Sequence, residues 1–410
     1  MCRLVGPLLS VLLCIVPSGC SWILPLGSGA DDDGLVRAEG AGQEGVAQDV
    51  GDVVLDGVPP PDGSTEKGAD LDGTGPRPPE AGPEGSPSDC LLLLGCDPYA
   101  NQWCDLSPGV PNDILGLAGP DLQNLWAVGK SGLVLRFKRD TCNWDIMPVT
   151  VSGSTISATL NDVWVTVTWP LSIQVDVVGD GGMLLRWMNN SWDNLSAALI
   201  TGSVYAIADA SGTLYAGGAQ GVLVKKSGGW DFDQGLGNTV RALSAGPGAV
   251  FAAGELGLLE QKDASSIANS FSVHACVQGG DVVLYGLWST GVLPTSTGYA
   301  LVAVGENTKA GRVAVFHDGG VCNPITELAK PAWRAVDGYA EVTTPPSPSP
   351  QEVWMVGDSG NVAHYEGTTS KPLTSPCSTH LNAVWVNPIT NPKLVVVAGD
   401  GGQIWARAYP

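Results

Sequence analysis

The amino-acid sequence predicts an all-β fold: a seven-bladed β-propeller with four-stranded blades, preceded by a disordered N-terminal tether. Three observations predict it. A hairpin motif recurs seven times, a second type of strand precedes each hairpin, and an acidic segment without aromatic residues precedes them all. The 55 glycines of the 410-residue chain fit a fold with many strands and many turns.

The hairpin motif is clearest near the C-terminus, in the segment VVVAGDGGQIWAR over residues 395–407. An apolar run, a glycine-rich turn and a second apolar run predict a tight β-hairpin, because glycine adopts positive φ at the turn without steric cost. Copies spaced by 36 to 52 residues, with no helical periodicity between them, are typical of a propeller. The first turn glycines of the seven copies are Gly129, Gly179, Gly218, Gly254, Gly305, Gly357 and Gly399.

A short strand precedes each hairpin and carries a small residue at one register position. Innermost propeller strands crowd around the axis, where little side-chain volume fits, so these are the expected inner strands. The small residues are Gly116, Ala206, Ala242, Gly286, Ala335 and Ala383, and Asp162 is the exception.

The last blade needs a strand from the N-terminal side, because the chain ends directly after the third strand of the seventh unit. The segment around Trp103 repeats the pattern of the outer strands at Trp144, Trp192 and Trp230. We therefore expect an N-terminal strand to complete the last blade and to leave no exposed sheet edge.

The N-terminus has the features of an export signal. Arg3 precedes 13 apolar or small residues and then the sequence PSGC. This ending resembles the bacterial lipobox, which implies a signal peptide over residues 1–19 and acylation of Cys20, with Pro17 standing where leucine is usual. Ser21 rather than aspartate follows Cys20, so the resemblance favours the outer membrane, with the protein facing the periplasm or the cell surface.

Residues 20–89 are predicted to be a disordered linker. From residue 28 to 89 there are 15 acidic and 3 basic residues and no aromatic ones, so too little apolar surface is available to offset the entropy of folding. The propeller is expected over residues 90–410. With 41 acidic and 20 basic residues in the chain, we expect no nucleic-acid partner and contact with the membrane only through the lipid.

The cysteine spacing suggests disulfides in an oxidising compartment, with Cys90–Cys96 and Cys104–Cys142 as the nearest candidate pairs. No Cys-x-x-Cys motif or cysteine–histidine cluster with zinc spacing occurs, so neither a metal nor another cofactor is expected. No catalytic motif of a hydrolase or nucleotide-binding enzyme occurs either, and no enzyme activity is expected.

The repeated unit VWxVGxxGxIxxY, with its inner LxAVW strand, resembles the BNR-like and photosystem-assembly-factor-like propellers of bacterial secreted proteins and lipoproteins. The resemblance covers roughly residues 100–410. It implies a propeller architecture, but propellers of this kind include both enzymes and binding modules.

Candidate binding residues lie where the inner strands begin, because these positions should surround the mouth of the channel. Tyrosine and arginine are favoured in recognition surfaces, although the same polar groups could simply line a wet channel. The candidates are Asn161, Tyr205, Arg241, Tyr285, Arg334 and Asn382, with Leu115 at the same register.

Acidic residues often follow the first turn glycine and could form a second ring on the same face. Such a ring would attract cations or a basic partner, or the acids could be ordinary turn residues. The acidic turn ring consists of Asp180, Glu255, Glu306, Asp358 and Asp400.

These features together predict a monomeric, non-catalytic binding or scaffolding module at the cell envelope, which presents one propeller face to an envelope protein or a glycan. Two alternatives stay open. One is a propeller enzyme that acts on extracellular carbohydrate. Its distinguishing feature would be a deep axial pocket with converging carboxylates or arginines. The other is an assembly factor for a membrane complex, as the family resemblance implies.

Overall fold

The computed structural model describes residues 90, 92, 96–97 and 100–409, with gaps at 169–171, 234–236, 247, 264–270, 274–280, 291–300, 308–310, 318–320, 326–331, 340–351, 367–369 and 388–392. All of these residues belong to one compact unit, Pro78–Pro410. The predicted signal peptide, Cys20 and the tether lie outside the described residues. No helix in the described part of the chain is long and apolar enough to cross a membrane.

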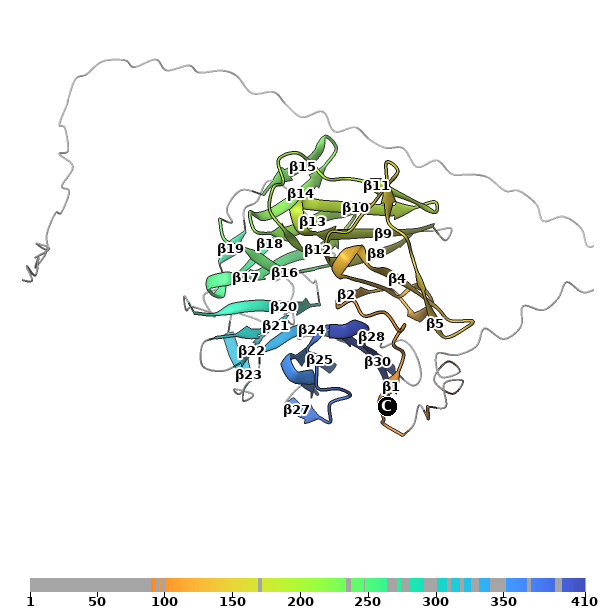
Figure 1. Ribbon diagram of the computed structural model, residues 1–410. Coiled ribbons are helices and arrows are strands. Elements are labelled where there is room, and N and C mark those ends of the chain that lie inside the picture. Colours follow the sequence, from red (N-terminus) through yellow and green to blue (C-terminus); the bar gives the residue numbers. More distant parts are fainter. Residues whose placement is uncertain are drawn as a thin grey trace, which may run out of the picture. The chain divides into compact units, whose positions relative to one another are not determined.

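The described strands form seven four-stranded antiparallel sheets and one two-stranded sheet. Each four-stranded sheet contains one predicted repeat. The inner strand of every sheet contacts the inner strand of the next, and the last of them, β28, contacts the first, β2. Figure 1 shows these inner strands gathered around a common centre with the later strands outside them. The predicted all-β propeller with four-stranded blades is confirmed.

The four strand positions have the following bounds. The inner strands are β2 (Ile114–Ala118), β8 (Leu160–Thr168), β12 (Val204–Ala210), β16 (Val240–Ala245), β20 (Val283–Ser289), β24 (Trp333–Tyr339) and β28 (Leu381–Asn387). The second strands are β3 (Trp126–Gly129), β9 (Ser172–Gly179), β13 (Thr213–Gly218), β17 (Ala249–Gly254), β21 (Leu301–Glu306), β25 (Glu352–Gly357) and β29 (Lys393–Gly399). The third strands are β4 (Val134–Lys138), β10 (Met183–Met188), β14 (Gly221–Lys226), β18 (Leu259–Asp263), β22 (Gly311–His317), β26 (Val362–Tyr365) and β30 (Ile404–Tyr409). The outer strands are β5 (Asn143–Ile146), β11 (Ser191–Asn194), β15 (Gly229–Phe232), β19 (Ser272–Val273), β23 (Val321–Ile325), β27 (Ser370–Leu373) and β1 (Cys104–Asp105). A separate small hairpin joins β6 (Thr150–Val151) and β7 (Ser154–Thr155).

The turn glycines have two different roles, and only one of them was expected. In the last repeat, Gly401 and Gly402 have φ of 69° and 72°, as a left-handed turn requires. Gly399 instead has an extended backbone, with φ of −167°. A Cβ atom there would lie 1.9 Å from the carbonyl oxygen of His380, so the first glycine is needed for the close approach of the second strand to the start of the inner strand.

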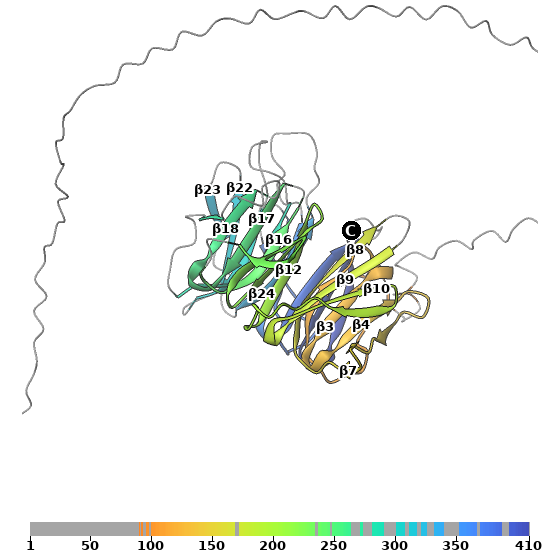
Figure 2. The ribbon, with the colours of Figure 1, turned by 90° about the horizontal axis from the view of Figure 1, so that it is seen from above.

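The apolar core lies between the sheets. Seven hydrophobic clusters are present among the described residues, and each joins two neighbouring sheets. In one of them, Trp126 and Val134 of one sheet pack with Val163 and Val177 of the next. These two sheets, which contain β3, β4, β9 and β10, lie side by side in Figure 2. The blades therefore stabilise one another rather than folding as separate units.

The N-terminal strand completes the last sheet, as predicted. Cys104 pairs with Ala406 and Asp105 pairs with Trp405, so β1 covers the outer edge of β30. Trp103 extends this contact, since its indole nitrogen donates a hydrogen bond to the carbonyl oxygen of Thr374 at 3.0 Å. The two ends of the propeller are thus held together through one sheet.

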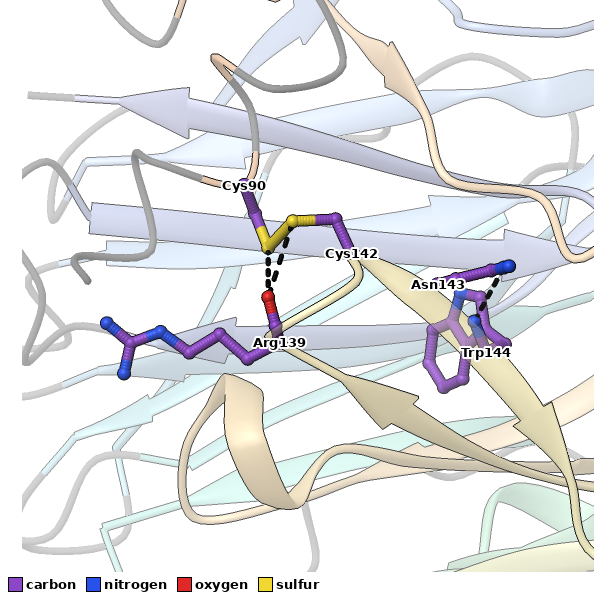
Figure 3. The surroundings of a disulfide bond; sticks show 5 residues. All are labelled: Cys90, Arg139, Cys142, Asn143 and Trp144. Atoms are coloured by element: carbon purple, nitrogen blue, oxygen red, sulfur yellow. Dashed lines mark hydrogen bonds between the residues drawn. A yellow bond between two sulfur atoms is a disulfide. The ribbon is translucent and has the colours of Figure 1, made fainter. Parts of the chain in front are cut away.

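Two disulfides fix the segment that leads into this strand. They join Cys90 to Cys142 and Cys96 to Cys104. The candidate pairs nearest in the sequence were wrong, because the N-terminal segment packs against the turn between β4 and β5, where Cys142 lies. The carbonyl oxygen of Arg139 lies 3.1 Å from the sulfur of Cys90 and 3.4 Å from that of Cys142 (Figure 3).

The disulfide assignment is tested by peptide mapping of the non-reduced protein. We expect Cys90 and Cys142 to appear in one linked peptide pair and Cys96 and Cys104 in another. Replacement of both Cys90 and Cys142 with alanine should lower the free energy of unfolding by roughly 2–5 kcal/mol, because the closed loop is long. Recovery of a Cys104–Cys142 peptide would show that the assignment is wrong.

Closure of the ring is tested by comparing two N-terminal deletions. Removal of residues 1–105 takes away β1, whereas removal of residues 1–89 leaves it in place. We expect the longer deletion to lower the melting temperature and to cause association, because it exposes the edge of β30. Equal melting temperatures and equal masses in solution would show that β1 does not close the ring.

Candidate functional site at the axial cavity

Each of the seven inner strands contains a β-bulge at the same place. In β28, Leu381 pairs with Gly399 and Ala383 pairs with Ala398, so Asn382 has no partner in the ladder. A bulge bends the strand and changes the direction of its extra side chain. The seven bulge residues, which we call the mouth ring, are Leu115, Asn161, Tyr205, Arg241, Tyr285, Arg334 and Asn382.

All seven residues of the mouth ring line a single axial cavity of about 520 Å³. Six of them are the residues that the sequence placed at the mouth, so the predicted positions lie together. The small residues that follow them, such as Ala206 and Ala242, also line this cavity and let the inner strands approach the axis. Whether the mouth ring binds a ligand stays a prediction.

The acidic turn ring lies directly beside the mouth ring, because each turn acid accepts a hydrogen bond from the bulge residue of its own sheet. Hydrogen bonds to charged groups are shorter and stronger than those between neutral groups. The bulge thus sets the backbone of each mouth residue, and the carboxylate fixes its side chain. The pairs are Asn161–Asp180 (3.1 Å), Arg241–Glu255 (2.6 Å), Tyr285–Glu306 (2.5 Å), Arg334–Asp358 and Asn382–Asp400 (2.9 Å).

Two of these pairs have clear effects on ionisation. The hydrogen bond from Arg241 lowers the pKa of Glu255. Burial, together with the hydrogen bond to Glu306, raises the pKa of Tyr285 to about 12. At neutral pH, Glu255 is therefore charged and Tyr285 is a protonated hydrogen-bond donor.

The two asparagines of the mouth ring also connect neighbouring blades. Asn161 donates a second hydrogen bond to the carbonyl oxygen of Val204, at the start of the next inner strand, at 2.9 Å. Asn382 does the same with the carbonyl oxygen of Ile114, at 3.1 Å, across the junction between the last and first blades. These amides hold the mouth at a fixed width.

The blade of β12 has no turn acid, because Ala219 follows its turn glycine. Its mouth residue, Tyr205, instead faces the neighbouring arginine. The guanidinium carbon of Arg241 lies 4.2 Å from the centroid of the Tyr205 ring, within the range of a cation–π interaction. Arg241 is therefore held by an aromatic ring on one blade and by Glu255 on its own.

The blade of β2 has a cation at the turn position. Its mouth residue is Leu115, and Lys130 stands at the position that is acidic in five of the other six blades. Lys130 forms an ion pair with Asp113 at 2.5 Å, and Asp113 also accepts a hydrogen bond from the backbone nitrogen of Gly401 in the last blade. Sequence reasoning missed this pair, although a lysine at the aligned turn position was the available signal.

Two carboxyl groups deeper in the cavity wall were also missed as site residues. Asp162 accepts hydrogen bonds from the backbone nitrogens of Val163 and Ile207, both at 2.9 Å. Asp337 accepts them from Gly338 and Val386, both at 2.8 Å. In each case the second donor belongs to the next blade, so each aspartate links two inner strands.

Burial dominates the ionisation of both aspartates. It raises the pKa of Asp162 and that of Asp337 to about 7, against the effect of their backbone hydrogen bonds. Both side chains are half-buried and line the cavity. The charge of the cavity wall therefore changes near neutral pH.

The arrangement offers hydrogen-bond donors, acceptors and aromatic faces around one opening. The guanidinium groups of Arg241 and Arg334 are already paired with carboxylates, and each carboxyl oxygen of Asp162 and Asp337 accepts one backbone hydrogen bond. Within the described ranges, no three histidine, cysteine or acidic side chains are placed to hold a metal ion. Such a site suits recognition of a polar group.

The two aspartates of the cavity wall predict a specific pH dependence of stability. Their pKa values are higher in the folded chain than the ordinary value of 3.8, so the stability that they contribute is complete below that value and is lost as the pH rises through about 7. Between pH 5 and pH 8, we expect the free energy of unfolding of the wild-type protein to fall relative to that of the Asp162→Asn/Asp337→Asn variant. The expected fall is on the order of 1 kcal/mol or more for each aspartate. Urea unfolding at several pH values measures this difference, and a difference that does not vary with pH would contradict the assignment.

Comparison with known proteins bears on the fold. No family model and no curated protein sequence matches the chain. Among solved structures, "YCF48 bound to D1 peptide" aligns with a TM-score of 0.55 and 14% identity, over 76% of this chain and 98% of that chain. YCF48 from Cyanidioschyzon merolae aligns with a TM-score of 0.53 and 13% identity, over 75% of this chain and 98% of that chain. At these identities, the likeness shows that the chain shares the β-propeller fold of these structures.

Proposed function

We propose that this protein is a non-catalytic binding module whose mouth ring receives a segment of a partner protein. The observation that carries the proposal is the convergence of all seven bulge residues on one axial cavity. Side chains that are fixed in advance by hydrogen bonds lose little conformational entropy when a ligand binds. In this proposal the seven four-stranded sheets make up one closed seven-bladed propeller, which acts as a monomer and needs no cofactor.

A polypeptide ligand is supported by the composition of the mouth and by one structural neighbour. Tyrosine and arginine, two of each in the mouth ring, are enriched in protein interfaces and their energetic centres. YCF48, which has the same fold, has been observed with a D1 peptide bound. A propeller of this fold can therefore accept a peptide, and a glycan is the less favoured ligand here.

We also propose that the propeller is exported and held at the cell envelope by a lipid on Cys20, on the outer membrane in preference to the inner one. The lipobox-like sequence supports the anchor, and the acidic composition of residues 28–89 supports an extended spacer that self-repulsion keeps open. The partner would then be another envelope protein. Such a tether would let the mouth reach segments at some distance from the bilayer.

The contacts around the cavity favour binding over carbohydrate hydrolysis. The distinguishing feature expected of an enzyme is a deep axial pocket with converging carboxylates or arginines, and both carboxyl groups and arginines do line the cavity. However, the oxygens of Asp162 and Asp337 accept backbone hydrogen bonds from two blades, which favours a structural role. Glycoside hydrolysis would require a carboxyl pair free to transfer a proton and to activate water.

An assembly factor for a membrane complex is a second candidate, and the peptide-bound YCF48 structure is the observation that favours it. The two candidates differ in the lifetime of the complex. A stable complex with one mature envelope protein favours a scaffold, whereas capture of a newly made subunit favours assembly.

The proposal is tested by photo-crosslinking in the native cell. A photoreactive phenylalanine analogue replaces Tyr205 in the mouth ring or, as the control, Ile146, which is 61% exposed on the outer strand β5. We expect position 205 to crosslink one segment of one envelope protein, identified by mass spectrometry, and position 146 not to crosslink it.

A matched pair of variants connects the crosslink to the mouth ring. Arg241→Ala/Arg334→Ala removes two mouth cations, and Lys138→Ala/Lys226→Ala removes two cations from exposed ion pairs on third strands. We expect the first variant to change the yield of the crosslink at least tenfold, because it leaves Glu255 and Asp358 unpaired at the mouth, and the second to leave the yield unchanged. A crosslink from position 146 alone, or one that both variants change equally, would overturn the proposal.

A further inference from the structure

The charges around the mouth are unevenly compensated. The three described cations at the mouth each have one acidic partner: Lys130 pairs with Asp113, Arg241 with Glu255 and Arg334 with Asp358. His380 also contacts Asp358, at 2.9 Å. Lys130 also lies close enough to Asp400 for the charge of that carboxylate to raise the pKa of the lysine, but its hydrogen bond goes to Asp113.

Among the described side chains, three turn acids accept hydrogen bonds only from neutral donors. Asp180 is bonded to Asn161, Glu306 to Tyr285 and Asp400 to Asn382. These carboxylates belong to three different blades around the ring, those of β8, β20 and β28. A carboxylate can accept several hydrogen bonds, so each keeps acceptor capacity for an external donor. Among the described side chains of the mouth, the acids therefore outnumber the lysines and arginines.

The cavity below the mouth adds a second and independent feature. Its wall contains the carboxyl groups of Asp162 and Asp337, which lie on the blades of β8 and β24. Two aromatic mouth residues, Tyr205 and Tyr285, line the same cavity. Carboxyl groups and aromatic faces in a partly enclosed cavity are the surroundings that stabilise an ammonium or guanidinium group.

The chain itself shows how a cation is held at this mouth. The guanidinium group of Arg241 lies over the ring of Tyr205 and forms an ion pair with Glu255 at 2.6 Å. Tyr285 and Glu306 provide the same two groups, an aromatic ring and a carboxylate, on the next blade. There the described residues supply no guanidinium bonded to the carboxylate, although the charges of Arg241 and Arg334 act on Tyr285 and partly offset the rise that burial causes in its pKa.

We propose that the mouth selects a polypeptide segment through a lysine or arginine side chain, which contacts the carboxylates of Asp180, Glu306 and Asp400 and enters the axial cavity. This inference rests on the proposed function and specifies its ligand class. Acidic segments are excluded by repulsion, and acetylated lysine is not accepted because it has lost its charge.

Binding of matched peptides tests the inference. The probes are three fluorescent hexapeptides of sequence Gly-Ser-X-X-Ser-Gly, in which X is lysine, acetyl-lysine or glutamate. Their binding to the full chain is measured by fluorescence anisotropy at about 0.15 M salt. At this salt concentration, charges farther apart than the Debye length are largely screened. We expect the lysine peptide to bind at least tenfold more tightly than the other two. Equal binding of all three peptides would overturn the inference.

Two triple variants separate the mouth from the general acidity of the chain and its tether. Asp180→Asn/Glu306→Gln/Asp400→Asn removes three charges at the mouth and keeps the hydrogen-bond acceptors. Asp145→Asn/Asp193→Asn/Asp231→Asn removes three charges from the outer strands β5, β11 and β15. We expect the mouth variant to weaken binding of the lysine peptide at least tenfold and the outer variant to change it less than twofold. Equal weakening by both variants, or by neither, would overturn the inference.

The peptide-binding experiment and the crosslinking experiment can distinguish a wrong ligand class from a wrong proposed function. If Tyr205-directed crosslinking captures one partner segment but the lysine peptide does not bind at the mouth, the ligand class is wrong and the binding module stands. If the crosslink is absent as well, the proposed function fails.

Discussion

The bulge at the start of every inner strand is the constraint on which the mouth depends. In a regular strand the side chains would alternate between the two faces of the sheet, which are covered by neighbouring blades. One extra residue takes the mouth residue out of the ladder, and the same step in every blade forms a ring of side chains around the cavity. The small residue that follows, such as Gly286 or Ala335, keeps the inner strands close: a Cβ atom at Gly286 would lie 3.0 Å from the Cα atom of Ala335. A larger residue there would push the blades apart.

Stability and recognition are coupled at this position. Asn161 and Asn382 each bind their own turn acid and the backbone of the next blade, so the contacts that set the width of the mouth also join the blades. Asp162 and Asp337 extend this coupling into the cavity. The disulfide between Cys90 and Cys142 and the pairing of β1 with β30 hold the remaining junction. A mouth supported in this way is rigid before a ligand arrives, which lowers the entropic cost of binding.

Much of the fold could be predicted from the sequence because its signals repeat. Each assignment, of the hairpin turns, the small inner residues and the Trp103 segment, was supported by similar sequences in the other repeats. The candidates for the mouth followed from aligning the seven inner strands. The pairing of each bulge residue with its turn acid could not be predicted, because it depends on the register shift that brings Tyr285 beside Glu306, 21 residues later. The disulfides were mispaired for a similar reason: proximity in sequence does not show that the N-terminal segment packs against the turn where Cys142 lies. In the sequence, Asp162 was only the exception to the small residues of the inner strands. Its role could be recognised only once the backbone of Ile207 in the next blade was seen to donate a hydrogen bond to it.

The central claim is that the bulge residue and the turn acid of a blade act as one unit. A double-mutant cycle on Tyr285 and Glu306 tests it most directly, with Tyr285→Phe, Glu306→Gln and the double variant compared by urea unfolding. Because the hydroxyl and the carboxylate oxygen are 2.5 Å apart, the account predicts that the two substitutions are coupled by about 1–3 kcal/mol. Effects that simply add, to within about 0.3 kcal/mol, would show that the two side chains are independent and would contradict the account of the mouth.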